Sequence, residues 1–321
     1  MADPRLHDDE VDTGPSLARR LVDSQFPQWA HRPIGPGSTT GTVNVLHRLG
    51  DDLVVRLPRV ARPFDDVDRE ARWLDRLRPH LPVAVPDQVA VGRPGEGYPG
   101  RWSIYRWIDG HTPDAANLTD PHLLASDLAG FITALQAVDT DGGSGPGGHR
   151  GGPLAARDRP TREAIGGLGH LIDVEAASEA WTASLATPAW TGPPVWVHAD
   201  LSPGNLLLRG GRLSAVLDFG SCGIGDPAAD LIVAWNLLPA DARATFREAV
   251  DVDHDTWNRG RGWALSIALI QLPYYEHTLP TMAADARRTI DQVLADHAST
   301  WSGRHPRAKR RRGAVVASVE P

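Results

Sequence analysis

One stretch of the chain holds three polar residues at spacings that could build a reaction centre. Asp200 is followed by Asn205 five residues later and by Asp218 eighteen residues later, and Asp218 opens an Asp-Phe-Gly triplet. An amide and a carboxylate oxygen suit Mg²⁺, which takes few protein ligands and completes its shell with water and nucleotide phosphates. A nearby loop aspartate can accept the proton of an attacking hydroxyl. Asn205 and Asp218 are therefore the predicted metal ligands, and Asp200 is the predicted base of a phosphoryl-transfer site.

Short apolar runs flank these residues and indicate how they could meet. Residues 195–197 are an expected strand, and residues 206–208 and 215–217 are two more, joined by a Gly-Gly pair that suits a hairpin turn. Asn205 precedes the first strand of this hairpin and Asp218 follows the second, so both side chains should emerge at the same edge. Either motif alone would more often be an ordinary loop, but their joint order and spacing favour the functional interpretation.

Two further segments complete a recognisable order of motifs. The triplet before Asn205 is His198-Ala199-Asp200, and Gly225-Asp226-Pro227 with Asp230 follows Asp218. Together they resemble the aminoglycoside phosphotransferase (APH) family of small-molecule kinases, over roughly residues 20 to 300. The resemblance implies an α+β, protein-kinase-like fold of two lobes. The N-terminal lobe would be small and built on an antiparallel sheet, and the C-terminal lobe would be larger and mainly helical.

The resemblance also implies roles for individual residues. Asp200 would be the catalytic base, Asn205 and Asp218 would hold Mg²⁺, and His198 and Asp226 would support them. The usual family triplet is His-Gly-Asp, so Ala199 departs from it, and we expect little consequence from one methyl group.

Protein kinases are the nearest alternative, and the spacing of the motifs speaks against them. Their activation segment needs tens of residues after Asp-Phe-Gly, whereas only a few separate Gly220 from Asp226 here, and an apolar helix over residues 231–238 is expected to follow at once. No platform for a peptide fits in that space. A small acceptor is therefore predicted.

The nucleotide side is expected in the first hundred residues. A Gly- and hydroxyl-rich turn over residues 35–43, with Ser38, Thr39 and Thr40, precedes two strand-like runs at 43–49 and 53–57. This arrangement is expected over the phosphates of ATP, although a plain loop would be the ordinary reading of such a turn.

The second of these strands ends in Arg56 where a phosphate-binding lysine would be expected. The only lysine of the chain is Lys309, near its end, so Arg56 is the candidate for the phosphates. A helix expected at about residues 66–78 carries Glu70 beside its apolar face, and Glu70 is the predicted ion-pair partner of Arg56, with a surface pair to a neighbouring arginine as the alternative.

The segment that joins the lobes is predicted around Tyr105 and Trp107, where backbone groups would hold the adenine. The predicted divisions are residues 1–104 for the N-terminal lobe, 105–303 for the C-terminal lobe and 304–321 for a basic, disordered tail. Residues 139–152 are rich in Gly and predict a flexible insertion. The acceptor side is placed near residues 153–158, 172–185 and 261–275, with Asp230, Tyr274 and Glu276 as candidate acceptor residues.

Composition limits the remaining functions. The 321 residues are 41% hydrophobic with a single cysteine, which allows two cores and excludes an intramolecular disulfide, and no apolar run is long enough for a membrane span. The formal charge of −7 divides into +5 from residue 304 onward and −12 before it. An acidic body disfavours nucleic acid, although surplus carboxylates are more often a solvated surface. A cytoplasmic protein is expected, and its oligomeric state is left open.

The sequence therefore predicts a Mg²⁺- and ATP-dependent O-phosphotransferase, with GTP as another possible donor, that acts on a hydroxylated small molecule. An antibiotic of the aminoglycoside type or another hydroxylated antibiotic is the first candidate acceptor. The alternatives are a metabolite kinase for an amino alcohol or sugar and, with less support, a non-catalytic nucleotide-binding protein.

Overall fold

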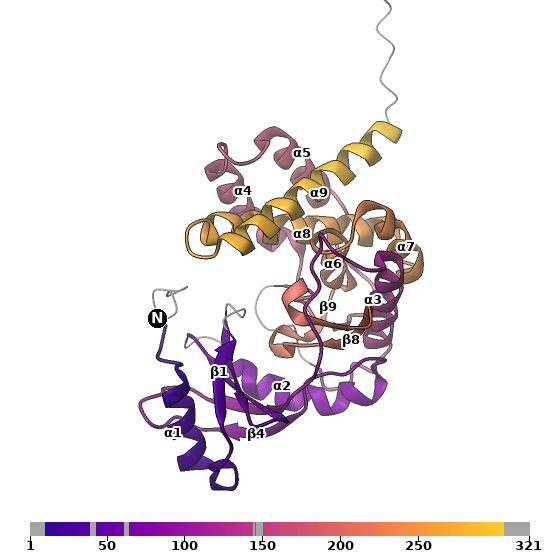
Figure 1. Ribbon diagram of the computed structural model, residues 1–321. Helices are drawn as coiled ribbons and strands as arrows, with labels where there is room; N and C mark the ends of the chain where they lie inside the picture. The colour runs from indigo at the N-terminus through magenta and orange to yellow at the C-terminus, as the bar shows by residue number, and fades with distance from the viewer. Residues whose placement is uncertain (1–9, 39–42, 61–63, 144, 146–149, 305–321) are drawn as a thin grey trace, which may run out of the picture.

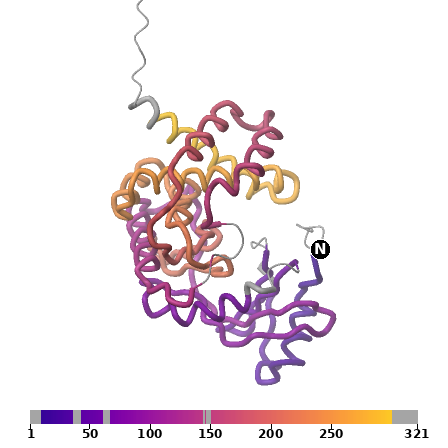
Figure 2. Tube along the Cα trace, turned by 180° about the vertical axis from the view of Figure 1, so that it is seen from behind, coloured from indigo at the N-terminus to yellow at the C-terminus, as the bar shows by residue number. Residues whose placement is uncertain are grey.

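The computed structural model describes residues 10–38, 43–60, 64–143, 145 and 150–304. A five-stranded antiparallel sheet with its helices forms one lobe, and the other lobe is mainly helical (Figure 1). Seen from behind, the two lobes remain separate masses joined along one side (Figure 2). The predicted α+β, kinase-like fold is confirmed.

The sheet of the first lobe has the strand order β1-β2-β3-β5-β4, with every neighbouring pair antiparallel. One helix covers each of its faces. These elements are β1 (Ile34–Ser38), β2 (Asn44–Leu49), β3 (Leu53–Pro58), β4 (Gln88–Gly92) and β5 (Trp102–Arg106), with helices α1 (Pro15–Gln25) and α2 (Phe64–Leu77).

The alternation of side chains along β3 divides this lobe into two faces. Leu53, Val55 and Leu57 pack with buried residues of α1 on one face. Val54 points to the other face, where it joins buried side chains of α2. Arg56 has the same parity as Val54, so the strand directs its guanidinium toward α2 and not toward α1.

The Gly-rich segment differs in part from the prediction. Its first residues are not a turn, because they form β1, which pairs with β2 from Ile34 opposite Leu49 to Ser38 opposite Leu46. Thr39 and Thr40 lie outside the described residues, and for Ser38 only the backbone is described. The strand-turn-strand arrangement therefore begins earlier in the chain than the glycines suggest.

The larger lobe is built around α8, a long helix that packs against α9, α5 and α4 (Figure 1). Its α-helices are α3 (Pro121–Gln136), α4 (Asp158–Gly167), α5 (Val174–Leu185), α6 (Val233–Asn236), α7 (Ala240–Val250), α8 (His254–Tyr275) and α9 (Pro280–Arg304). Three-residue to six-residue 3₁₀ segments lie between them: η3 (Leu154–Arg157), η4 (Pro203–Asn205), η5 (Phe219–Ser221) and η6 (Pro227–Ile232).

Two helical predictions need correction. The segment after Asp226 is η6 followed by the short α6, and not one helix over residues 231–238, because Asp226 caps a tight 3₁₀ start through Ala228 N. The last helix continues to Arg304, which the prediction assigned to the disordered tail.

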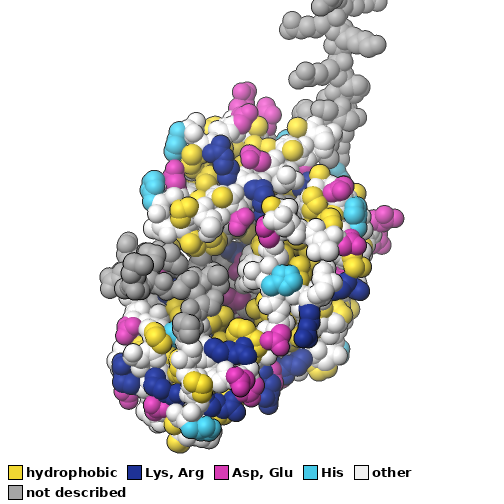
Figure 3. Space-filling view, in the orientation of Figure 1, with side chains coloured by type: hydrophobic (Ala, Val, Ile, Leu, Met, Phe, Trp, Pro, Cys, Tyr) yellow, Lys and Arg dark blue, Asp and Glu magenta, His cyan; other side chains and the backbone are white. Residues whose placement is uncertain are grey.

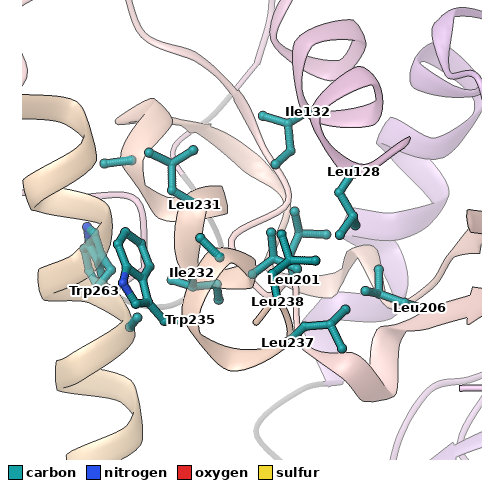
Figure 4. Close-up of a cluster of buried hydrophobic side chains, with 14 of the residues drawn as sticks. Leu128, Ile132, Leu201, Leu206, Leu231, Ile232, Trp235, Leu237, Leu238 and Trp263 are labelled. Carbon is teal, nitrogen blue, oxygen red and sulfur yellow. The ribbon is translucent and has the colours of Figure 1, made fainter. Parts of the chain in front are cut away.

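The core of the larger lobe joins α3 to the segment that carries the reaction-centre motifs. Figure 4 shows Leu128 and Ile132 of α3 on one side, Leu201, Leu231 and Leu237 near them, and Trp235 beside Trp263 at the other end. All of these side chains are buried. Each buried leucine contributes about 1.5–3 kcal/mol relative to an exposed one, so this core holds the motif loops against α3 and α8.

The predicted hairpin is present in this lobe. β7 (Leu206–Arg209) pairs with β8 (Arg212–Val216), and Gly210 and Gly211 both have positive φ, 58° and 78°, as a two-residue primed turn requires. The predicted strand β6 (Val195–Val197) pairs with β9 (Gly223–Gly225). In the described part of the chain, no helix has the length and apolarity needed to cross a membrane.

Candidate active site

The ion pair predicted between Arg56 and Glu70 is present between β3 and α2. Nη1 of Arg56 donates to Oε2 of Glu70, and Nη2 donates to Oδ1 of Asp218 at 2.8 Å. The Arg56 side chain is 10% exposed and that of Glu70 is fully buried. One guanidinium therefore joins the sheet lobe to the Asp-Phe-Gly segment of the helical lobe.

Each carboxylate oxygen of Glu70 also accepts a hydrogen bond from another donor. The hydroxyl of Tyr105 donates to Oε2 at 2.5 Å, and the backbone N–H of Phe219 donates to Oε1 at 2.7 Å. Burial raises the pKa of Glu70, and Arg56 opposes that shift. Burial alone would lower the pKa of Arg56, but Asp218 and Glu70 outweigh it and raise that pKa well above its ordinary value. The guanidinium is charged at any working pH.

The two residues predicted at the junction of the lobes, Tyr105 and Trp107, have different surroundings. Tyr105 is buried, and burial followed by the nearby Glu70 raises its pKa, so its hydroxyl stays protonated and serves Glu70. The side chain of Tyr105 is therefore part of the ion-pair network, and the binding of the adenine by backbone groups near it stays a prediction. Trp107 is 39% exposed and lies under the guanidinium of Arg48, 3.9 Å from the ring centre.

Asn205 and Asp218 come together at one end of the hairpin, as predicted. Leu217 N donates to Asn205 O at 2.8 Å, and Asn205 Nδ2 donates to Asp200 O at 2.8 Å. The amide nitrogen of Asn205 is thereby engaged, which leaves its oxygen as the group suited to a cation. Asp218 adopts a left-handed conformation with φ 62° and keeps a third of its side chain exposed.

The charges at this end of the hairpin suit a divalent cation. Arg56 supplies one positive charge against the two carboxylates of Glu70 and Asp218, so the cluster has an excess of negative charge. Mg²⁺ is commonly held by one or two protein oxygens together with phosphate oxygens and water. Asp218 and Asn205 fit such a site, and no cluster of three or more His, Cys, Asp or Glu side chains suited to a metal occurs among the described residues.

His198 is buried beside this site, and both of its ring nitrogens contact backbone groups. It is fully buried, its Nε2 lies 2.9 Å from Leu217 O, and Asp200 N donates to its Nδ1 at 3.3 Å. These two contacts assign the Nε2–H tautomer. Its ring packs edge-on against Phe219, so it joins the loop of Asp200 to the Asp-Phe-Gly segment.

Ala199 is more constrained than the sequence suggests. Its φ is 64°, in the left-handed region that glycine adopts freely and that costs other residues about 1–2 kcal/mol. The expectation of little consequence from its methyl group is therefore wrong as regards the backbone. The conformation is held by Asp230, which accepts from His198 N at 2.8 Å and from Ala199 N at 2.7 Å.

Asp230 does not face an acceptor. Its side chain is fully buried and its two carboxylate oxygens each accept one of these backbone amides. Burial raises the pKa of Asp230, and His198 together with the two amides opposes that shift. Its placement in the acceptor set is corrected: the residue shapes the loop that carries Asp200.

Asp226 and Cys222 are also buried, and both contact only other parts of the protein in this structure. Asp226 is buried and forms a two-point pair with Arg259 of α8, at 2.7 and 3.2 Å, while its Oδ1 accepts from Ala228 N. Cys222 is fully buried, and burial raises the pKa of its thiol. The cysteine packs as a small apolar residue.

Asp200 has a partner that the sequence pattern did not reveal. Nη1 of Arg150 donates to Oδ1 of Asp200, and their side chains are 27% and 31% exposed. Arg150 belongs to the Gly-rich segment predicted to be a flexible insertion. Both ends of that segment are attached, because Asp139 O accepts from Trp196 Nε1 at 2.9 Å and Gly151 O accepts from Asp226 N at 2.9 Å.

The other two candidate acceptor residues lie at the C-terminal end of α8. The ring of Tyr274 packs edge-on against that of Tyr275 and is 52% exposed, and Oε1 of Glu276 lies 3.7 Å from Nε2 of His170. The surface between the two lobes is hollowed on the face shown in Figure 3.

Comparison with known proteins agrees with the geometry. The model of the phosphotransferase enzyme family APH matches residues 31–263. An aminoglycoside 3'-phosphotransferase from Escherichia coli is 30% identical over 225 residues, which are 66% of this chain and 78% of that protein.

Solved structures show the same fold. The GDP and kanamycin complex of APH(2")-IIia has a TM-score of 0.68 at 20% identity, covering 87% of this chain and 98% of that one. The macrolide 2'-phosphotransferase MphH from Brachybacterium faecium has a TM-score of 0.55 at 23% identity, covering 86% and 98%. The match over more than half of the chain, the Escherichia coli relative and the kinase-like arrangement of the site lead to one conclusion: the chain belongs to the APH phosphotransferase enzyme family.

Proposed function

We propose that this small-molecule phosphotransferase transfers the γ-phosphoryl group of ATP to a hydroxyl of its acceptor, with Mg²⁺ as the metal. The observation that carries the proposal is the meeting of two clusters. Asn205 donates a hydrogen bond to the backbone of Asp200 and shares an end of the hairpin with Asp218. Asp218 forms an ion pair with Arg56, and Arg56 forms a second ion pair with Glu70. A base, two oxygen ligands and a fixed cation are the parts that phosphoryl transfer requires.

The residues of the chain would divide the work as follows. Mg²⁺, held by Asp218 and Asn205, would supply positive charge to the phosphate oxygens. Arg56, fixed by Glu70, would bind phosphate oxygens from the sheet side. Asp200 would orient the acceptor hydroxyl and take its proton as the new O–P bond forms and the bond from the γ-phosphorus to the bridging oxygen breaks. Fixed charges and positioning, more than covalent chemistry, would lower the barrier.

The identities of the phosphoryl donor and of the acceptor can be determined by one assay. Release of ADP or GDP should be measured with Mg²⁺ and either ATP or GTP across aminoglycosides, macrolides, peptide antibiotics, amino alcohols, sugars and hydroxy acids. Relatives and structural neighbours named as aminoglycoside and macrolide phosphotransferases support a hydroxylated antibiotic as the first candidate class. Failure of every acceptor together with failure to bind Mg–nucleotide would contradict the proposal.

A metabolite kinase is the second candidate, because one observation favours it. Arg150 forms an ion pair with Asp200, and its guanidinium would repel an aminoglycoside, which carries several positive charges. The chemistry at Asp200 would be the same for either class of acceptor.

Substitution of Arg56 tests its contribution to nucleotide binding separately from its contribution to stability. Arg56→Ala should weaken nucleotide binding and lower the free energy of unfolding by about 3–5 kcal/mol, because it leaves Glu70 buried without its cation. The double variant Arg56→Ala/Glu70→Gln should recover much of the stability without recovering nucleotide affinity. Urea unfolding and calorimetric titration with Mg–AMP-PNP measure the two quantities. Unchanged nucleotide affinity in both variants would remove Arg56 from the phosphate site.

Asp230 gives a test of the loop geometry. Asp230→Asn replaces one of two acceptor oxygens by an amide that cannot accept from a backbone N–H, so the free energy of unfolding should fall by about 1–3 kcal/mol and turnover should fall with it. Asp285→Asn, on an exposed turn of α9, is the control. An acceptor KM that rises with no loss of stability would instead return Asp230 to the acceptor pocket.

A further inference from the structure

The loop that carries Asp200 is held mainly through its backbone. Asp230 accepts from the backbone N–H groups of His198 and Ala199. Asn205 donates to the backbone oxygen of Asp200 at 2.8 Å. None of these contacts reaches the carboxylate of Asp200. The last torsion of an aspartate side chain has a broad, roughly two-fold profile, so backbone contacts alone leave its two oxygens free to rotate.

Arg150 is the residue that contacts this carboxylate. Its Nη1 donates to Oδ1 of Asp200 and lies 3.4 Å from the backbone oxygen of Ala199. One nitrogen thus lies against the carboxylate and against the preceding peptide, which ties the side chain of Asp200 to the backbone of its own loop. Among the described residues, no other group forms a hydrogen bond with the carboxylate of Asp200. Oδ2 is therefore the oxygen left for an acceptor hydroxyl.

The backbone beside Arg150 is attached to the larger lobe. Gly151 O accepts from Asp226 N at 2.9 Å, and Arg259 of α8 holds the carboxylate of Asp226 at 2.7 and 3.2 Å. Gly151 is buried and has a φ of 85°, a left-handed conformation that glycine adopts without the steric cost that other residues meet. The chain therefore turns at a fixed place, and this turn sets where the side chain of Arg150 begins.

The pair of Arg150 and Asp200 is better suited to orientation than to stability. The two side chains are 27% and 31% exposed, and ion pairs with this much solvent contact contribute little to the free energy of folding. The rate of a reaction is more sensitive, because a misplacement of about 1 Å between reacting groups can cost about 100-fold. Removal of Arg150 should therefore affect turnover far more than folding.

We propose that Arg150 is a positioning residue for Asp200, which holds Oδ1 so that Oδ2 faces the acceptor hydroxyl and takes its proton. The proposal rests on the phosphotransferase function proposed above and adds a residue from outside the reaction-centre motifs. The hydroxyl oxygen forms the new O–P bond, the nucleoside diphosphate leaves with the electron pair of the broken bond, and the proton passes to Oδ2. Arg150 itself exchanges no atom.

Kinetics of Arg150→Ala test this role. The substitution should lower kcat roughly 10- to 100-fold. The Kd for Mg–AMP-PNP and the acceptor KM should change by less than about twofold, because Arg150 contacts neither substrate. The melting temperature should fall by no more than about 2–4 °C. The rate is measured with the most active acceptor of the nucleotide-release panel, and with water as the acceptor in hydrolysis of Mg–ATP.

A double variant shows whether Arg150 acts through Asp200. Arg150→Ala should add less than about twofold to the loss of kcat caused by Asp200→Asn, because the carboxylate that it orients is no longer present. A residue that contacted the transferred phosphoryl group directly would lower kcat by the same factor in both backgrounds.

Rescue experiments and a control variant separate orientation from general effects of charge. Arg150→Lys keeps the charge but not the geometry of the guanidinium, so it should retain more turnover than Arg150→Ala. Guanidinium ion at millimolar concentration should restore part of kcat to Arg150→Ala and none to Asp200→Asn, with NaCl as the salt control. Arg159→Ala removes an arginine whose side chain is 89% exposed and paired with Glu163, and it should behave as the unmodified enzyme does.

Four outcomes would overturn the proposal. These are an unchanged kcat in Arg150→Ala, equal losses in both backgrounds, a loss of turnover with a large fall in melting temperature that Arg150→Lys does not repair, and weaker binding of Mg–AMP-PNP with unchanged binding of ADP. The last result would assign Arg150 to the γ-phosphate. Failure of the phosphotransferase proposal is distinct, since the unmodified protein would then neither bind Mg–AMP-PNP nor release ADP or GDP, and the role of Arg150 would fail with it.

Discussion

Asp200→Asn should reduce kcat by at least about 100-fold while the affinity for Mg–AMP-PNP changes little. Asparagine keeps the shape of the side chain but cannot take the proton of the acceptor hydroxyl. Arg56 and Asp218, which the proposal places at the phosphates, keep their ion pair in this variant. The measurement is single-turnover and steady-state kinetics with whichever acceptor the nucleotide-release panel identifies.

Asp241→Asn is the control for this substitution, because Asp241 lies on α7 with its side chain 70% exposed. It should retain the kinetics of the unmodified enzyme. If Asp200→Asn kept most of its turnover, Asp200 would not be the base. If it lost nucleotide binding together with turnover, its role would be structural.

Asp218→Asn should abolish the dependence of nucleotide binding on Mg²⁺ and reduce kcat/KM by at least about 100-fold, because the metal supplies several kcal/mol of charge stabilisation. Asparagine tolerates the left-handed conformation that Asp218 adopts, so the backbone should not change. The same substitution releases Arg56 from one of its two carboxylates. Nucleotide affinity measured in EDTA should therefore be equal to that of the unmodified enzyme or higher.

Asn205→Ala is the comparison that tests the metal assignment. It should weaken Mg²⁺-dependent binding less than Asp218→Asn does, because a neutral amide contributes less to a hard cation than a carboxylate. Titration of Mg²⁺ against each variant, followed by nucleotide calorimetry, gives both values. Small and equal effects would mean that neither residue holds the metal.

The ion pair of Arg56 and Glu70 could be predicted because both residues lie on regular elements. Period-two alternation on β3 and the i, i+3, i+4 spacing on α2 determine which face each side chain takes. The packing of α2 on this side of the sheet then brings those faces together. The hairpin between Asn205 and Asp218 was predictable for a similar reason, since two adjacent glycines with positive φ require a tight turn.

The corrections concern residues whose roles depend on distant partners. Asp230 has the type and position of a binding residue, but its oxygens are used by two backbone amides on a loop thirty-one and thirty-two residues earlier. The hydroxyl of Tyr105 likewise donates to Glu70, thirty-five residues earlier, while the binding of the adenine by backbone groups near Tyr105 stays a prediction. No local pattern carries either contact.

The sequence by itself determined the family, the order of the reaction-centre motifs and the α+β fold, because strands, turns and amphipathic faces follow from local spacing. Only the tertiary structure decided the surroundings of Asp200. Arg150 lies fifty residues before Asp200 in a Gly-rich segment without periodicity, and its contact with Asp200 forms only in the folded chain. Charge balance in a pocket is a sum over side chains from separate elements, so it is set when those elements pack.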